Sequence, residues 1–91
     1  MTYVYLIRCS DLPYYKIGLT TNLLERLEAL QTANPLPLTI VCTCGFGSFG
    51  AARRAECDCH RTLAKERMHG EWFQLTPEQV AQLRCDMALA E

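Results

Sequence analysis

The sequence has no long hydrophobic run, almost no net charge and no repeat, linker or low-complexity segment. No apolar stretch approaches the roughly 20 residues that cross a bilayer, so we expect no membrane association. The first seven residues have no basic region ahead of their apolar stretch and do not resemble a signal peptide. They predict the first strand of a soluble, cytoplasmic protein. The net charge of −1 argues against holding nucleic acid by bulk electrostatics alone.

A single small domain is predicted over residues 1–91, because a chain of 91 residues can build one core. The hydrophobic fraction of 49% is ordinary for a folded protein. Charge is unevenly distributed along the chain, since bases gather between residues 53 and 67 and acids dominate from residue 71 onward. This pattern fits either one basic and one acidic face or a solvated surface of mixed charge.

Cysteine is abundant, with six residues, and raises the question of a zinc site. The two close pairs have C-x-C spacing, not the C-x₂-C spacing of a typical zinc knuckle. Cys42 and Cys44 would share one face of a strand, whereas Cys57 and Cys59 on a helix would point roughly 200° apart. We therefore expect free thiols in a reducing compartment and no structural zinc.

The first half of the chain predicts a β-hairpin, a helix and a third strand. Residues 3–9 and 14–19 are rich in aromatic and β-branched residues, and residues 10–13 have the composition of a turn. Asn22 and Glu25 fit the cap of a helix running from Leu23 to about Ala33, and Asn34-Pro35 ends it. This helix would bury one apolar stripe, consisting of Leu23, Leu24, Leu27 and Leu30. Residues 38–44 predict the third strand.

The second half predicts two helices separated by a short extended segment. Ser48 can cap a helix over about 51–65, which would turn Ala52, Ala55, Cys59 and Leu63 inward. Residues 71–75 look extended, and Thr76-Pro77 begins a last helix over 77–90. The fold class is therefore α+β with the order β-β-α-β-α-(β)-α.

An ordered set of motifs indicates a phosphate-processing protein. The guanidinium of Arg26 suits an anionic substrate because it can grip two oxygens at once. The motifs are Tyr3-Val4-Tyr5, Lys16-Ile17-Gly18, Asn22 with Arg26, Glu56 with His60, and Gly70-Glu71-Trp72-Phe73. This set resembles the GIY-YIG nuclease superfamily, and within it the small phage and bacterial T5orf172 branch. The resemblance covers residues 1–76.

The resemblance implies a three-stranded antiparallel sheet flanked by helices, and hydrolysis of phosphodiester bonds with one divalent ion. It implies an endonuclease acting on nucleic acid, with DNA expected, in a bacterial or phage-infected cell. Glu56 would be the ligand of Mg²⁺ or Mn²⁺, and Arg26 would neutralise charge on the scissile phosphate. Tyr5 would hydrogen-bond or deprotonate the attacking water. His60 would assist proton transfer or support the metal ligand without itself binding the ion.

The chain departs from the family pattern at Lys16, which stands where the second motif has tyrosine. Tyr15 directly precedes it, but neighbours on a strand point to opposite faces, so only one of the two can face the site. By spacing Lys16 takes the position, where it can contact phosphate as a point charge.

The sequence also allows other interpretations of the protein's function. The chain could be a non-catalytic module that binds nucleic acid or a protein through the basic residues Arg53, Arg54, Arg61 and Lys65. A zinc-stabilised interaction domain is a weaker alternative. Taken singly, Glu56 could merely pair with Arg53, and Gly18 could merely relieve crowding against the first helix. The specificity for sequence, shape, or DNA over RNA is not encoded in a recognisable motif, and a homodimer or a partner could supply it.

Overall fold

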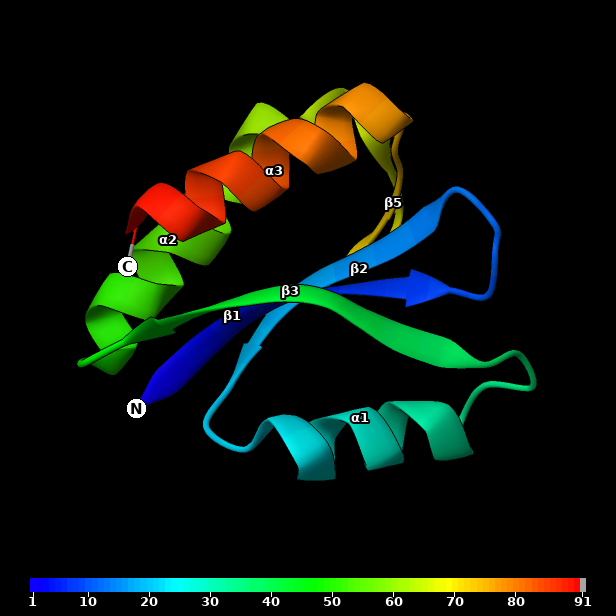
Figure 1. Cartoon of the computed structure of the whole chain (residues 1–91), viewed down its shortest axis with the longest axis horizontal. Coiled ribbons are helices and arrows are strands. Elements are labelled where there is room, and N and C mark those ends of the chain that lie inside the picture. Colours follow the sequence, from blue (N-terminus) through cyan, green and yellow to red (C-terminus); the bar gives the residue numbers. More distant parts are fainter. Residues whose placement is uncertain (91) are drawn as a thin grey trace.

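The computed structural model describes residues 1–90. Within them one antiparallel sheet has the order β3-β1-β2-β5-β4, formed by β1 (Thr2–Cys9), β2 (Tyr14–Thr20), β3 (Leu38–Phe46), β4 (Arg67–His69) and β5 (Trp72–Gln74). The helices of this part are α1 (Leu23–Thr32), α2 (Phe49–Thr62), the short 3₁₀ helix η1 (Ala64–Glu66) and α3 (Pro77–Ala90). Helix α1 covers one face of the sheet, and α2 and α3 lie on the other side (Figure 1).

The α+β class is confirmed, but the expected three-stranded sheet is too narrow. The described residues form five strands in the element order β-β-α-β-α-β-β-α. The extended segment near residue 72 becomes β5, which pairs with β2. Strand β4 was not predicted, because its three residues are all exposed and show no alternation of apolar and polar side chains. Gly70, at φ +58°, makes the turn that folds β4 back onto β5.

The predicted helix caps are confirmed by hydrogen bonds. The Asn22 side chain accepts from the Glu25 N–H at 3.1 Å, and the Ser48 hydroxyl accepts from the Ala51 N–H at 3.2 Å. At α3, Thr76 and Gln79 exchange two hydrogen bonds, the reciprocal arrangement of a capping box. Helix α2 begins two residues earlier than expected, at Phe49, and ends at Thr62. No helix within residues 1–90 is long and apolar enough to cross a membrane.

Two apolar clusters occupy the two faces of the sheet. The larger lies under α2 and α3 and includes Val4, Leu6, Ile17 and Phe73, all almost completely buried. The smaller lies under α1 and includes Tyr5, Ile7, Cys9 and Leu38. Alternate residues of β1 therefore feed opposite clusters, as the period of a strand requires. The predicted inward stripe of α1 is wrong at Leu24, which is 73% exposed and lies outside the buried side of the helix.

The six cysteines all lie within the described residues, form no disulfide and differ in burial. Cys9 and Cys44 are buried, Cys42 and Cys59 are half-buried, and the remaining two, Cys57 and Cys85, are exposed. Burial raises the pKa of both the Cys42 and the Cys59 thiol. These two therefore behave as small apolar groups in the cluster under α2 and α3.

We expect β5 to be essential to stability although it is only three residues long. Phe73→Ala should lower the free energy of unfolding by about 3–5 kcal/mol, because it empties a fully buried aromatic position. The matched control is Leu89→Ala in α3, where the side chain is 81% exposed and little should change. Urea denaturation compares the two, and equal effects would show that β5 does not close the core.

Candidate active site

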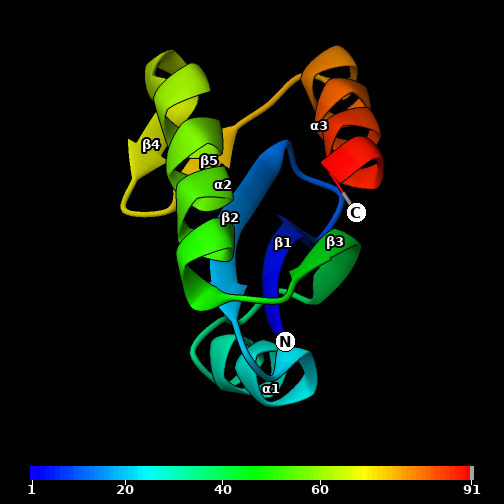
Figure 2. The same cartoon turned by 90° about the vertical axis from the view of Figure 1, so that its left-hand side faces the viewer.

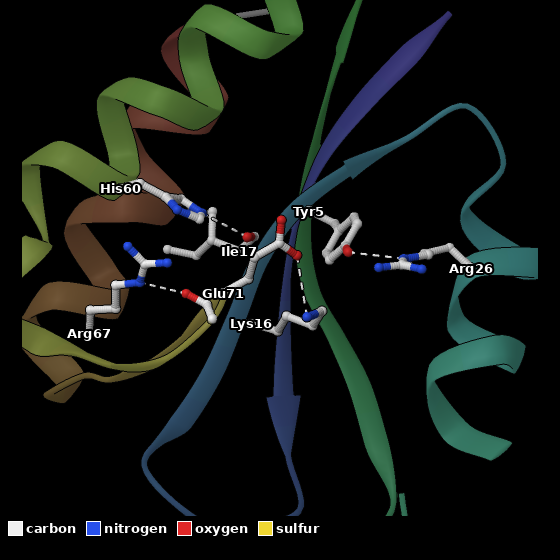
Figure 3. Close-up of polar contacts among 8 residues, drawn as sticks. Tyr5, Lys16, Ile17, Arg26, His60, Arg67 and Glu71 are labelled. Atoms are coloured by element: carbon white, nitrogen blue, oxygen red, sulfur yellow. Dashed lines mark hydrogen bonds and ion pairs between the residues drawn. The ribbon is translucent and has the colours of Figure 1, made fainter. Parts of the chain in front are cut away.

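Strand β2 changes partner along one edge, and this change brings three segments together. Strand β5 pairs with β2 only at Tyr14, Tyr15 and Lys16. At the next residue, the Ile17 N–H donates to the Glu71 carbonyl at 3.1 Å, and the Ile17 carbonyl bonds His60 Nε2 at 2.9 Å. Helix α2 and the segment entering β5 are thus fastened to the same strand residue (Figures 2 and 3).

The hydrogen bond to Ile17 fixes the state of the His60 ring. A carbonyl oxygen only accepts, so His60 Nε2 must carry the proton and donate it. In the neutral ring, Nδ1 then keeps its lone pair. Phe73 holds the ring from another side, edge to face, with the centroids 4.9 Å apart. His60 therefore presents a defined tautomer to its neighbours on α2 and at the start of β5.

Gly18 lies at the centre of the site, and its missing side chain leaves room for the neighbouring side chains. It lies opposite Tyr5 in the β1–β2 register. A Cβ atom on Gly18 would lie 2.4 Å from Tyr5 Oη and 3.1 Å from Glu71 Oε1, so these oxygens occupy the space that a side chain would fill. The crowding that calls for glycine here comes from Tyr5 and Glu71, not from the first helix as one sequence interpretation held.

Helix α1 carries Arg26, whose side chain contacts Tyr5. Arg26 Nε donates to Tyr5 Oη at 3.3 Å, as Figure 3 shows. Burial raises the pKa of Tyr5, and the hydrogen bond from Arg26 only partly opposes this effect. The same bond raises the pKa of Arg26. The pair therefore presents a neutral phenol, whose proton is free to donate, beside a permanent positive charge.

Lys16 and Glu71 form an ion pair on the face of the sheet that carries Tyr5. Lys16 Nζ lies 3.2 Å from Glu71 Oε1 and 5.6 Å from the centroid of the Trp72 ring. The Lys16 side chain is 11% exposed and that of Glu71 is 37% exposed, so the lysine end of the pair is shielded and the carboxylate is partly open to water. Tyr15 belongs to the core cluster on the opposite face, where Arg8 lies over its ring. The structure therefore puts Lys16, and not Tyr15, beside Tyr5.

Glu56 reaches this cluster from α2 and is buried. Its pKa is raised, first by burial and then by the carboxylate of Glu71, while His60, Arg53 and Lys16 act in the opposite direction. The alternative pairing of Glu56 with Arg53 is not found, because the ion pairs within residues 1–90 join Lys16 to Glu71 and Arg61 to Asp58. Glu56 therefore keeps its oxygens available to a ligand.

Glu56, His60 and Glu71 could together hold a metal ion. Each offers a ligand atom, and these atoms all lie within 4.8 Å of one another. The two carboxylates fit a hard divalent ion such as Mg²⁺ or Mn²⁺, while the nitrogen ligand is more typical of transition metals. Glu71 was not assigned a role from the sequence. The Gly70-Glu71-Trp72-Phe73 motif marked the segment, but only the turn and the Ile17 hydrogen bond direct this carboxylate into the site.

The four basic residues of α2 and η1 that were predicted to bind nucleic acid differ in their relation to this site. Arg53 acts electrostatically on Glu56 and so lies near the cluster. Arg61 is paired with Asp58 on the exposed side of the helix. Arg54 and Lys65 are exposed as well. Of the four, the structure associates only Arg53 with the residues around Gly18.

Gly18→Ala tests the packing of the site directly. We expect it to lower the free energy of unfolding by about 1–3 kcal/mol, because the added methyl group would collide with Tyr5. The loss should shrink when Tyr5→Leu is introduced as well, since the ring that crosses Gly18 is then gone. Gly47→Ala is the control, because no atom lies within 4 Å of a Cβ at that position. A loss that is unchanged in the Tyr5→Leu background would show that Gly18 is needed for another reason.

Comparison with known proteins identifies the family. A family model described as the T5orf172 domain matches residues 2–87, nearly the whole chain. No curated protein and no solved structure gave a significant match. The motifs around Tyr5, Gly18, Arg26 and Glu56 thus lie within the matched region and converge on one site. The chain belongs to the T5orf172 family of GIY-YIG-like nuclease domains.

Proposed function

We propose that this protein is a divalent-metal-dependent endonuclease that hydrolyses phosphodiester bonds in nucleic acid, with DNA as the substrate. One observation carries the proposal. Tyr5, Lys16, Arg26, Glu56 and His60 come from four separate elements, yet contacts through Gly18 and Glu71 join them into one cluster. Such a cluster combines cations for a phosphate with carboxylates for a metal ion.

Arg26 and Lys16 are the phosphate-binding groups in this proposal. Arg26 uses Nε on Tyr5, so the two terminal nitrogens of its guanidinium remain available for phosphate oxygens. Lys16 is held by Glu71 and Trp72 and adds a second positive charge on the same face. Fixed cations of this kind stabilise the charge that develops on phosphorus substituents in the transition state.

Glu56 and Glu71 would hold Mg²⁺ or Mn²⁺. When bound, the ion would supply charge neutralisation on the phosphate and lower the pKa of a water molecule. His60 acts as a positioning residue, because its donated hydrogen bond to Ile17 anchors the turn of α2 that carries Glu56. If the ring also offers Nδ1, Mn²⁺ would be favoured over Mg²⁺.

Tyr5 orients the attacking water in this mechanism and does not act as its base. A phenol whose pKa is raised by burial holds its proton at neutral pH. Its oxygen accepts from Arg26, so the hydroxyl hydrogen can be donated to the water or to a phosphate oxygen. A glutamate side chain is ordinarily ionised at neutral pH, so a carboxylate beside Tyr5 can accept the proton of the attacking water, which a protonated phenol cannot.

Glu56→Gln should reduce divalent-dependent cleavage of plasmid DNA by about 10²-fold or more. Replacing a residue that only supports a metal ligand through a hydrogen bond already lowers metal affinity or activity by about 10–100-fold. The fold should be retained. Burial raises the pKa of Glu56, so its carboxylate weakens the folded state at pH values above that raised pKa. Removing the charge should therefore not lower stability at pH 7. For the same reason, cleavage by the unmodified protein should fall as the pH drops through the raised pKa.

The matched control is Glu78→Gln, an acid in the first turn of α3. Plasmid nicking in Mg²⁺ or Mn²⁺, with EDTA as blank, and thermal unfolding are measured on both variants. Full cleavage by Glu56→Gln would remove the metal role from this residue. Normal DNA binding by a native protein that never cleaves with either ion would instead support the non-catalytic binding module.

Arg26→Ala should reduce the rate of cleavage more than it reduces the affinity for DNA. The loss of one well-placed electrostatic donor costs on the order of 10²–10³ in rate, whereas one phosphate contact among several changes affinity far less. Affinity is measured by gel shift in Ca²⁺, and the rate by single-turnover cleavage in Mg²⁺. Arg84→Ala, at an exposed position of α3, is the control. Lost binding with a normal rate at saturation would make Arg26 a docking residue.

A further inference from the structure

We propose that a small pocket beside the active-site cluster binds one unpaired nucleobase, so that the enzyme acts on DNA with an extruded or unpaired nucleotide. This inference rests on the proposed function and names its substrate class. The pocket has a volume of about 240 Å³ and opens between β2, the β4–β5 hairpin and the end of α1. Its lining consists of Cys9, Tyr14, Asn34, Met68, His69 and Trp72.

The lining has the chemistry that recognises a flat heteroaromatic ring. Tyr14, His69 and Trp72 are ring side chains, and Met68 adds a polarisable thioether. Aromatic side chains bind bases by stacking on their π-faces, which works for every base. The Asn34 side-chain oxygen already accepts from the Leu36 N–H at 3.0 Å, so its amide nitrogen is the group that can donate to a base edge. The volume lies below the roughly 300 Å³ at which pockets for drug-sized ligands begin, so a single ring system fits better than a larger ligand.

The position of the pocket connects it to the cluster around Gly18. Trp72 lies opposite Lys16 in the β2–β5 register, and His69 lies opposite Trp72 in the β4–β5 register. These side chains and Tyr14 therefore share the face of the sheet that carries Tyr5. The Trp72 ring lines the pocket and also has Lys16 Nζ 5.6 Å from its centroid. A base stacked on Trp72 would therefore have its own backbone phosphate near Lys16.

A base in a continuous duplex stack cannot enter such a pocket, because both of its faces are covered by neighbouring base pairs. Extrusion costs least for a base that is already unpaired. The rim of the pocket is accessible, since Met68 is 49% exposed and His69 is also exposed. The pocket therefore selects DNA by local structure and leaves the sequence unread, in keeping with a stacking surface that offers few hydrogen-bonding groups.

The chain carries its own reporter, because Trp72 is its only tryptophan. In EDTA, the full chain is titrated with three DNA duplexes of equal length: fully paired, with one unpaired thymidine, and with an abasic residue in place of that thymidine. We expect the unpaired thymidine to quench Trp72 emission and to bind about ten-fold tighter than the other two. The abasic duplex carries the same phosphate charge, so it removes the electrostatic contribution from the comparison.

Two variants complete the test. His69→Ala should abolish the ten-fold preference for the unpaired base, whereas Phe49→Ala, at a 57% exposed aromatic on α2, should leave both that preference and cleavage in Mg²⁺ unchanged. Cleavage by the unmodified protein with equal quenching by all three duplexes would overturn the base pocket and leave the proposed function standing. Base-dependent quenching without any cleavage would support the pocket and overturn the nuclease. No binding to any of the duplexes would overturn both.

Discussion

The edge of β2 is the constraint on which the rest of the site depends. Up to Lys16 this edge is closed by β5, and from Ile17 onward it is open to groups that are not part of the sheet. Both backbone groups of Ile17 must find partners there, since buried peptide groups are costly when unpaired. The Glu71 carbonyl and the His60 ring supply them. Satisfying one strand residue thus positions the two segments that carry the carboxylates.

Two charged groups of the site, Glu56 and Lys16, are placed where water is scarce. Glu56 is buried with a raised pKa, and Lys16 is shielded and paired with Glu71. Burying an isolated charge is costly, so groups of opposite sign must accompany one another. The low polarity of the surroundings in turn strengthens every electrostatic interaction with a bound phosphate. The buried Glu56 carboxylate lowers the stability of the folded state, and the two apolar clusters on either side of the sheet offset this cost.

Much of this arrangement follows from the sequence, and the exceptions have physical reasons. Local signals predict the hairpin, the capped helix starts and the order of motifs, because caps and strand periods act over a few residues. The strand period also predicts that Lys16 and Tyr15 point to opposite faces. Strand β4 escapes prediction because its exposed residues carry no pattern, and its pairing depends on the Gly70 turn. The contribution of Glu71 depends on contacts between distant segments, which no local pattern reveals.

The uneven burial of the cysteines determines how the protein responds to oxidants and to thiol reagents. Only a thiolate attacks, so the raised pKa of Cys42 and Cys59 keeps these two groups inert inside the cluster under α2 and α3. Cys57 and Cys85 lie on the outer surfaces of α2 and α3 and are accessible to reagents. Air oxidation would therefore link one molecule to another through these surfaces and leave the interior and the face bearing Tyr5 chemically intact.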